Sequence, residues 1–541
     1  MPETDMTSPM PASGVFTTQT RFPRAAFNEP PKVFARLMWF DTSGNFIAYA
    51  DEGPKSVEVA PPLPDPKSVT PDQNAQLRSS IQVGGITYSF AQPTLSGQYA
   101  GGRWWVRSPV TITAISPNSV RSGDRWMHGV EVNWGHDQGA TDNDRQGADS
   151  EPHRRSDGTA TANTIPYQHD RNRDPAIRGA MIFNSGQEGS VVKWRSDPSA
   201  PGTRRYKISE IQVLTVVASA PPAGALYPGY ASSRAKVTGL TDGDVNLALL
   251  PNHAFPTAQG IPSTYQQVLA KARRVYQHGN LRAFKQNINV WPEQQYTYSV
   301  ETSEILLWLL SNWINASQKK ALALAFIENG FDIYERIKSG AKYELSGRLA
   351  PITFAAIMLN HADMLAHIDY TNTDVHRAGY KARTDQTPPW PLAGPLFQEF
   401  LQIRYVDQWR INNPPNARVN NSHPFPLPYP QSMLGRPEWG IEAWTRPSTD
   451  DYWLGGTYRS NNSGHQWQTG LGLQLLPGAR QAIKHPAFFD YLDYLKNRMW
   501  QRPDREGPNR PQPWFKPIWD AFRVRGGPIY PHVCPTNRPG Y

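Results

Sequence analysis

Residues 302–334, TSEILLWLLSNWINASQKKALALAFIENGFDIY, decide the fold of the second half of this chain. Apolar residues recur in this stretch at steps of three and four, which is the period of an α-helix. Two helices are expected, one beginning near Thr302 and one beginning near Ser317. The apolar faces comprise Ile305, Leu306, Leu309, Leu310, Trp313 and Ile314 in the first helix and Leu324, Ile327, Phe331 and Tyr334 in the second. Helices of this kind are typical of antiparallel helical hairpins.

The rest of the second half continues the helical period. Further helices are expected after Ser346, through Ile352, Ala356 and Leu359, and over residues 264–278, 396–409 and 486–500. Residues 466–476 have the same apolar content, but Gly470 and Gly472 weaken the prediction of a helix there. Because each hairpin can bury its apolar face on the next, an α/α-toroid is the preferred architecture, and an irregular helical bundle is the alternative.

The first half has a different pattern, typical of antiparallel β-structure. Its apolar runs are short, rich in β-branched and aromatic residues, and separated by turn residues. These runs are VFARLMWFD (33–41), NFIAYAD (45–51), WWVRSPVTITAIS (104–116), SVVKWRS (190–196) and KISEIQVLTVVAS (207–219). Residues 41–45, DTSGN, suit a hairpin turn between the first two runs. A β-sandwich-like domain is therefore expected before the helices.

The length of 541 residues favours two domains, since a single hydrophobic core rarely grows to this size. Residues 221–230, PPAGALYPGY, form a natural linker between the β-rich and helical halves. The predicted fold class is α+β and multidomain. The predicted parts are an N-terminal tail (1–30), a β-rich domain (31–225), an α/α-toroid domain (226–525) and a C-terminal tail (526–541).

Composition and missing motifs exclude several classes of protein. The net charge of +9 is spread without a basic block, so no nucleic-acid partner is expected, although a diffuse positive field suits an anionic polymer. The single cysteine, Cys534, allows no intramolecular disulfide. No apolar run is long enough to span a membrane, and the N-terminus has no signal-peptide pattern, so secretion would require a leader that has been removed. Walker, dinucleotide-binding, serine-hydrolase and His-Glu-x-x-His motifs are all missing.

Residues 435–459, GRPEWGIEAWTRPSTDDYWLGGTYR, interleave charged and aromatic side chains in a Gly/Pro-rich segment. Such a segment suits a cleft that stacks on the apolar faces of sugar rings and binds their polar edges. A long loop pinned to the protein by its tryptophans is the alternative. The predicted substrate-binding residues are Trp439, Trp444, Trp453, Glu438 and Glu442, together with Gln402 and Tyr405, which share one face of the helix expected over 396–409.

Two sets of residues are candidates for catalysis. Asn360 with His361, and Tyr458 with Arg459, supply the amide, imidazole, phenol and guanidinium that β-elimination from a uronic acid requires. The competing set is a pair of carboxylates for glycoside hydrolysis, Glu399 with Glu438 or Glu442. A polar pair at a solvated helix end is the structural alternative for Asn360 and His361.

A metal site is a further hypothesis. Residues 134–174 are polar and Gly-rich, and Asp142, Asp144 and Asp149 offer oxygen ligands for a structural divalent cation. The spacing does not match a calcium-binding EF-hand loop. No other cofactor is expected.

The order of segments resembles the helical-toroid polysaccharide lyases. The resemblance lies in the layout of GGRWWVRSPVTITAISP (101–117), GRLAPITFAAIML (347–359), LFQEFLQIRYV (396–406) and RPEWGIEAW (436–444), with the β domain placed first. It covers roughly residues 101–500. It implies cleavage of an acidic polysaccharide by β-elimination, with Tyr458, Arg459, Asn360 and His361 as functional residues, Arg348 assisting Arg459, and Glu399 orienting Tyr458. The alternatives are a glycoside hydrolase and a non-catalytic glycan-binding or virion protein.

Overall fold

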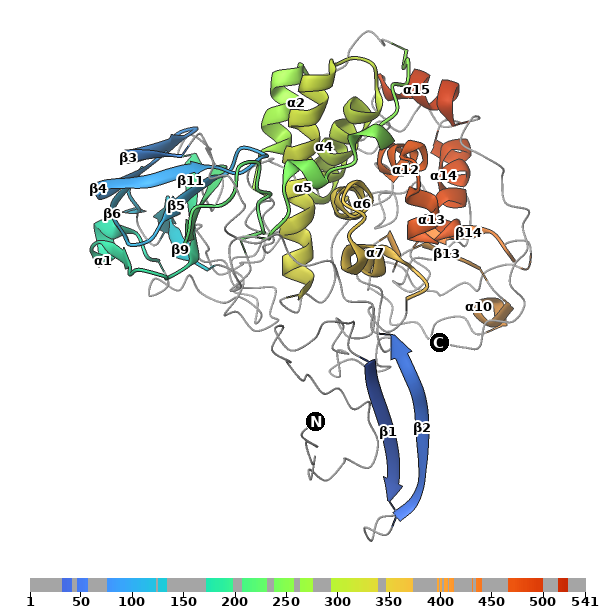
Figure 1. Ribbon diagram of the computed structural model, residues 1–541. Helices are drawn as coiled ribbons and strands as arrows, with labels where there is room; N and C mark the ends of the chain where they lie inside the picture. Colours follow the sequence, from blue (N-terminus) through green and yellow to red (C-terminus); the bar gives the residue numbers. More distant parts are fainter. Residues whose placement is uncertain are drawn as a thin grey trace. The chain divides into compact units, whose positions relative to one another are not determined.

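The computed structural model combines strands in the first half of the chain with helices in the second (Figure 1). The described residues are 32–40, 46–56, 75–122, 125–133, 172–197, 207–230, 238–256, 263–275, 293–338, 347–372, 397, 399–400, 403–406, 408–412, 431, 434–439, 466–499 and 514–523. Two compact units are present, residues 1–69 and 70–541. The mixed α+β class is thus confirmed. The sandwich, the toroid and the domain boundary near residue 225 stay predictions.

The first unit contains a two-stranded antiparallel hairpin. β1 (Lys32–Phe40) pairs with β2 (Phe46–Ser56), and Phe40 lies opposite Phe46 across the turn. The antiparallel pairing predicted for these two runs is therefore confirmed, whereas the predicted turn at 41–45 lies outside the described residues.

The second unit contains an eight-stranded sheet in the order β10-β6-β4-β5-β12-β11-β9, with β3 paired to β4 outside this path. All neighbours are antiparallel except β5 and β12. The strands are β3 (Gln76–Val83), β4 (Ile86–Gln98), β5 (Trp104–Arg107), β6 (Val110–Ser116), β9 (Val130–Val132), β10 (Met181–Phe183), β11 (Gly189–Asp197) and β12 (Lys207–Val217). β7 (Val120–Ser122) and β8 (Arg125–Met127) form a separate ribbon.

The central strands of this curled sheet are buried on both faces. On β12, Val213 and Val217 pack in one apolar cluster, whereas Leu214 and Val216 pack in another. Alternation of side chains along a strand explains the division, because neighbouring residues point to opposite faces. The near-continuous apolar run of this strand follows from burial on both sides.

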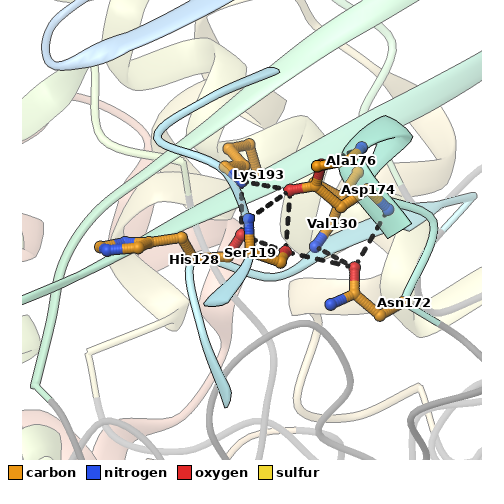
Figure 2. A network of polar contacts seen from close by, with 7 residues as sticks. All are labelled: Ser119, His128, Val130, Asn172, Asp174, Ala176 and Lys193. Carbon is orange, nitrogen blue, oxygen red and sulfur yellow. Dashed lines mark hydrogen bonds and ion pairs between the residues drawn. The ribbon is translucent and has the colours of Figure 1, made fainter. Parts of the chain in front are cut away.

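A network of buried polar side chains supports one end of the sheet (Figure 2). Asp174 caps the short helix α1 (Pro175–Arg178) by accepting the N–H of Ala176, and its Oδ2 accepts bonds from Ser119 and from the Lys193 ammonium, 3.0 Å away. Lys193 also donates to the carbonyl of His128. These bonds tie β11 to the segments around Ser119, His128 and α1.

The helices in the second half of the chain, apart from α10, contribute to one large apolar core. They are α2 (Tyr265–Ala272), α4 (Glu293–Leu310), α5 (Ala316–Lys338), α6 (Leu349–Met358), α7 (Ala362–Ile368), α10 (Gln408–Asn412), α12 (Gln466–Leu475), α13 (Ala479–Ile483), α14 (Pro486–Met499) and α15 (Phe515–Phe522), with single 3₁₀ turns η4 (Asp242–Asp244) and η5 (Leu247–Leu249). α4 packs against α2, α5, α6 and α12. Residues 302–310 are therefore buried on every side.

Three helix predictions are corrected by the structure. Thr302 does not cap a helix: it lies inside α4 and its hydroxyl donates to the carbonyl of Tyr298 at 2.9 Å. The helix expected over 396–409 is wrong, because Ile403–Tyr405 is strand β13 and pairs with β14 (Pro437–Trp439). The Gly-interrupted segment does form a helix, α12.

The glycines in α5 and α12 lie at close helix contacts. An added Cβ on Gly470 would be 2.2 Å from Cδ1 of Leu492, and one on Gly472 would be 2.8 Å from Cδ2 of Leu306. On Gly330 it would be 2.7 Å from the backbone carbonyl of Pro351 in α6. Only glycine allows α5 and α6 to approach so closely, which offsets its poor helix propensity.

We therefore expect Gly330→Ala to destabilise the helical part by about 1–3 kcal/mol, since the overpacked atom is backbone and cannot rotate away. Gly472→Ala, whose nearest neighbour is the end of a leucine side chain, should cost less. Urea unfolding of the two variants measures the difference. If the two variants lose the same free energy of unfolding, the close contact between α5 and α6 is not the cause of the destabilisation in Gly330→Ala.

The sheet is joined to the helices by a buried arginine. Arg103 lies in the turn before β5, and its Nη1 donates to Oδ2 of Asp332 on α5 at 2.6 Å while its Nη2 donates to Oδ1 of Asn329 at 3.0 Å. Its guanidinium also lies over the ring of Tyr227, 4.4 Å from the centroid. Glu328, one turn before Asp332, accepts the N–H of Gly101 at 2.9 Å. We call the set of residues in these contacts the Arg103 joint: Gly101, Arg103, Tyr227, Glu328, Asn329 and Asp332.

Candidate functional site

The predicted site residues are divided between described and undescribed parts of the chain. Side chains are described for Arg348, Asn360, His361, Glu399, Tyr405 and Glu438. Only the backbone is described for Trp439. The others lie outside the described residues: Tyr458, Arg459, Trp444, Trp453, Glu442, Gln402 and the predicted cation ligands in 142–149.

Glu399 is a fully buried carboxyl group in the helical core. Its Oε1 accepts the backbone N–H of Gly347 at 2.7 Å and the side-chain amide of Gln466 at 3.5 Å. Its Oε2 is buried and has no hydrogen-bond partner among the described residues. The two oxygens of this carboxyl group are therefore chemically different.

Burial raises the pKa of Glu399 to about 7. The backbone N–H groups of Gly347 and of Glu399 itself, the Gln466 amide and the charge of Arg348 all favour the ionised form, but together they do not offset the cost of desolvation. Near neutral pH the group can therefore give or accept a proton, as a general acid or base must.

The turn before α6 places the Gly347 N–H and the Arg348 cation beside this carboxyl. Gly347 has a φ of +86°, and a Cβ there would be 2.5 Å from Oγ of Ser299 on α4. Thr302 donates to the carbonyl of Gly347 at 3.2 Å. The guanidinium of Arg348 lies over the ring of Tyr298, 4.4 Å from the centroid. Helix α4 thus supports both the backbone donor and the cation.

Helix α12 supplies the amide. Gln466 is its first residue and follows the aromatic segment 435–459 by seven positions in the chain. Two further buried atoms, Oε1 of Gln466 and Oγ of Ser299, have no hydrogen-bond partner within the described part of the chain. We call Ser299, Gly347, Arg348, Glu399 and Gln466 the Glu399 cluster.

The start of the aromatic segment is a strand that pairs with the chain just after Glu399. In the ladder between β13 and β14, Arg404 lies opposite Glu438, and the Glu438 side chain is buried. Tyr405 donates its hydroxyl to Oδ2 of Asp490 on α14. The helical spacing that grouped Gln402 with Tyr405 is therefore wrong, since Tyr405 is in a strand.

Asn360 and His361 form the corner between α6 and α7. Asn360 has a left-handed φ of 45°, and Nδ1 of His361 accepts the N–H of Met364 at 3.4 Å as the N-cap of α7. The His361 ring lies 5.3 Å from that of Tyr334, and burial lowers the pKa of this histidine. These contacts involve no residue of the Glu399 cluster, so the structure gives the pair a capping role, and its catalytic role stays a prediction.

Arg348 and Glu399 are the two predicted catalytic residues that the structure brings together. Gly347, Ser299 and Gln466 were not predicted. A Gly before Arg348 and a Gln at a helix start carry no catalytic signal by themselves, because their importance depends on contacts between segments far apart in the sequence.

The described residues contain neither a membrane-spanning helix nor a cluster of metal ligands. No helix among them is sufficiently long and apolar to cross the membrane. They also contain no group of three or more His, Cys, Asp or Glu residues placed to hold a metal ion. Comparison of the chain with protein-family models, curated proteins and solved structures finds no match.

Proposed function

We propose that this protein is an enzyme that cleaves an acidic, uronate-containing polysaccharide by β-elimination, with the Glu399 cluster in its active site. The observation that supports the proposal best is a buried carboxyl group with one oxygen held by two donors, the other without a partner among the described residues, and Arg348 beside it. Buried ionisable groups with shifted pKa values are concentrated at functional sites.

The chemistry requires three roles. A cation neutralises the uronate carboxylate and so acidifies the proton on C5; a base removes this proton; and an acid protonates the departing oxygen as the C4–O bond breaks and a C4–C5 double bond forms. In the proposal Arg348 and Arg459 supply the positive charge, and Tyr458 exchanges protons with the substrate. Glu399 orients the Tyr458 hydroxyl through Oε2. Trp439, Trp444 and Trp453 bind the sugar rings.

Glycoside hydrolysis is the second candidate. It is favoured by the pKa of about 7 that burial gives Glu399, since a protonated carboxyl group near neutral pH is the general acid that glycosidases use. Glu438 or Glu442 would then be the second carboxylate.

Glu399→Gln tests the proposal. Wild-type protein incubated with pectate, alginate or hyaluronan is expected to produce the ultraviolet absorbance of an unsaturated uronate, and the variant should lose about 10²-fold or more of this rate. Glu301→Gln is the matched control, because Glu301 on α4 forms an ion pair with the largely exposed Arg274. Reducing ends without absorbance would support hydrolysis instead. If neither unsaturated uronate nor new reducing ends appear, a non-catalytic glycan-binding protein is the better account.

The same variant has an expected effect on stability. The folded-state pKa of Glu399 is above that of an unfolded glutamate, so ionisation of the buried group opposes folding as the pH rises through about 7. A neutral glutamine avoids this cost. Relative to wild type, Glu399→Gln should therefore gain stability as the pH rises from about 4, near the pKa of an unfolded glutamate, to about 7, measured by urea unfolding. A constant difference across this range would contradict the raised pKa.

A further inference from the structure

The hydrogen bonds of Glu399 distinguish its two oxygens before any substrate binds. Oε1 receives both donors, the Gly347 N–H at 2.7 Å and the Gln466 amide at 3.5 Å. Oε2 receives none from the described residues. A proton on Oε1 would have to displace donors that are already in place, whereas a proton on Oε2 displaces no donor from the described residues.

The two donors come from different elements and have different supports. The Gly347 N–H is fixed by the left-handed turn and by the bond from Thr302 to its carbonyl. The Gln466 amide is fixed by its position at the start of α12, where the side chain is fully buried. Gln466 bears no charge, so it can hold a carboxyl oxygen in either protonation state.

We infer that Gln466 is a positioning residue which, with the Gly347 N–H, keeps Oε1 of Glu399 as a permanent acceptor and leaves Oε2 to carry the exchangeable proton. The catalytic consequence of this assignment rests on the proposed function; the assignment itself does not.

Other groups around the carboxyl are consistent with this role. Arg348, at the start of α6, is the charged residue that acts on Glu399. Helix α4 faces the Gly347 turn with Ser299 and Thr302, which are uncharged. Removal of the Gln466 amide therefore leaves the charges unchanged and removes one hydrogen bond that favours the carboxylate.

The test is an infrared titration of Glu399 in the full-length protein, in which the stretch of the protonated carboxyl is assigned by its loss in Glu399→Gln. In Gln466→Met the pKa of Glu399 should rise by about half a unit to one unit, the size expected for loss of one hydrogen bond. Gln468→Met is the matched control: Gln468 is also buried on α12, but its Oε1 accepts a bond from Ser303 at 3.2 Å. This control should leave the titration unchanged.

Gln466→Glu provides a second variant in case the first folds poorly. Two adjacent carboxyl groups cannot both ionise readily, so the pair should titrate in two widely separated steps. An unchanged titration in Gln466→Met, an equal shift in Gln468→Met, or independent titration in Gln466→Glu would each overturn the inference. If the wild type has neither lyase nor hydrolase activity, the proposed function fails while the infrared result still decides the assignment. If activity is present, the alkaline limb of its pH profile should move with the measured pKa.

Discussion

Replacing Arg103 by methionine is expected to destabilise unit 70–541 by about 3–5 kcal/mol and to loosen the contact between the sheet and α5. The two carboxyl groups in contact with Arg103, on Glu328 and Asp332, are almost fully buried. Removal of the guanidinium leaves both without this cation in a region of low dielectric constant. Methionine fills much of the same volume, so the loss measures charge and hydrogen bonding more than packing.

The effect of Arg103→Met should depend on pH, with a sign fixed by Glu328. Burial raises the pKa of Glu328 to about 7, against the opposing effect of Arg103. Because the folded-state pKa lies above the unfolded value, the group opposes folding as pH rises through about 7. Without Arg103 the cost of ionisation is greater, so the variant should lose more stability at pH 8 than at pH 5.

Urea unfolding at the two pH values, with hydrogen exchange of the α5 amides, measures this prediction. Arg195→Met is the control, since the Arg195 side chain is 47% exposed in its 3.5 Å ion pair with Glu210 on the same sheet, and its loss should cost about 1 kcal/mol or less. A loss in Arg103→Met no greater than in the control, or one independent of pH, would show that the Arg103 joint contributes little.

The fold could be predicted from the sequence where the local period is clear. The hairpin between β1 and β2, the strands around Trp105 and Val213, and helices α5, α6 and α14 follow from apolar spacing and turn residues. Where the predicted helices differ from the structure, the reason is packing between segments that are distant in the sequence. α4 begins at Glu293, before its apolar period starts, and α12 tolerates two glycines because neighbouring side chains occupy the space next to them.

The site could be predicted only in part. Glu399 and Arg348 were found as residue types suited to the chemistry, and the structure adds their shared neighbours. The spacing of Tyr405 from Gln402 predicts a helix, but pairing between β13 and β14 overrides that local pattern. Gly347 and Gln466 could not be found, since the spacing of residues along the chain contains no information about which backbone N–H or amide meets a distant carboxyl.

Replacing Lys193 by methionine is the second change with a large expected effect, about 3–5 kcal/mol of stability. Lys193 and Asp174 are fully buried and 3.0 Å apart, so the variant leaves the aspartate without its cation. Asp174→Asn in the same background should recover part of the loss, because the remaining buried group is then neutral.

Lys193 affects the pH dependence of wild-type stability with a sign opposite to that of Glu328, although the deficit of the variant again grows as the pH rises. Burial lowers the pKa of Lys193 to about 8, against the attraction of Asp174. Between about pH 8 and the pKa of an unfolded lysine, the unfolded chain therefore binds more protons than the folded one, and wild-type stability should gain from this group as pH rises. The gain should be missing in Lys193→Met, so the difference in unfolding free energy between the two proteins should widen from pH 8 to pH 10. A difference that narrows or stays constant would mean that the ammonium is better solvated than its complete burial indicates.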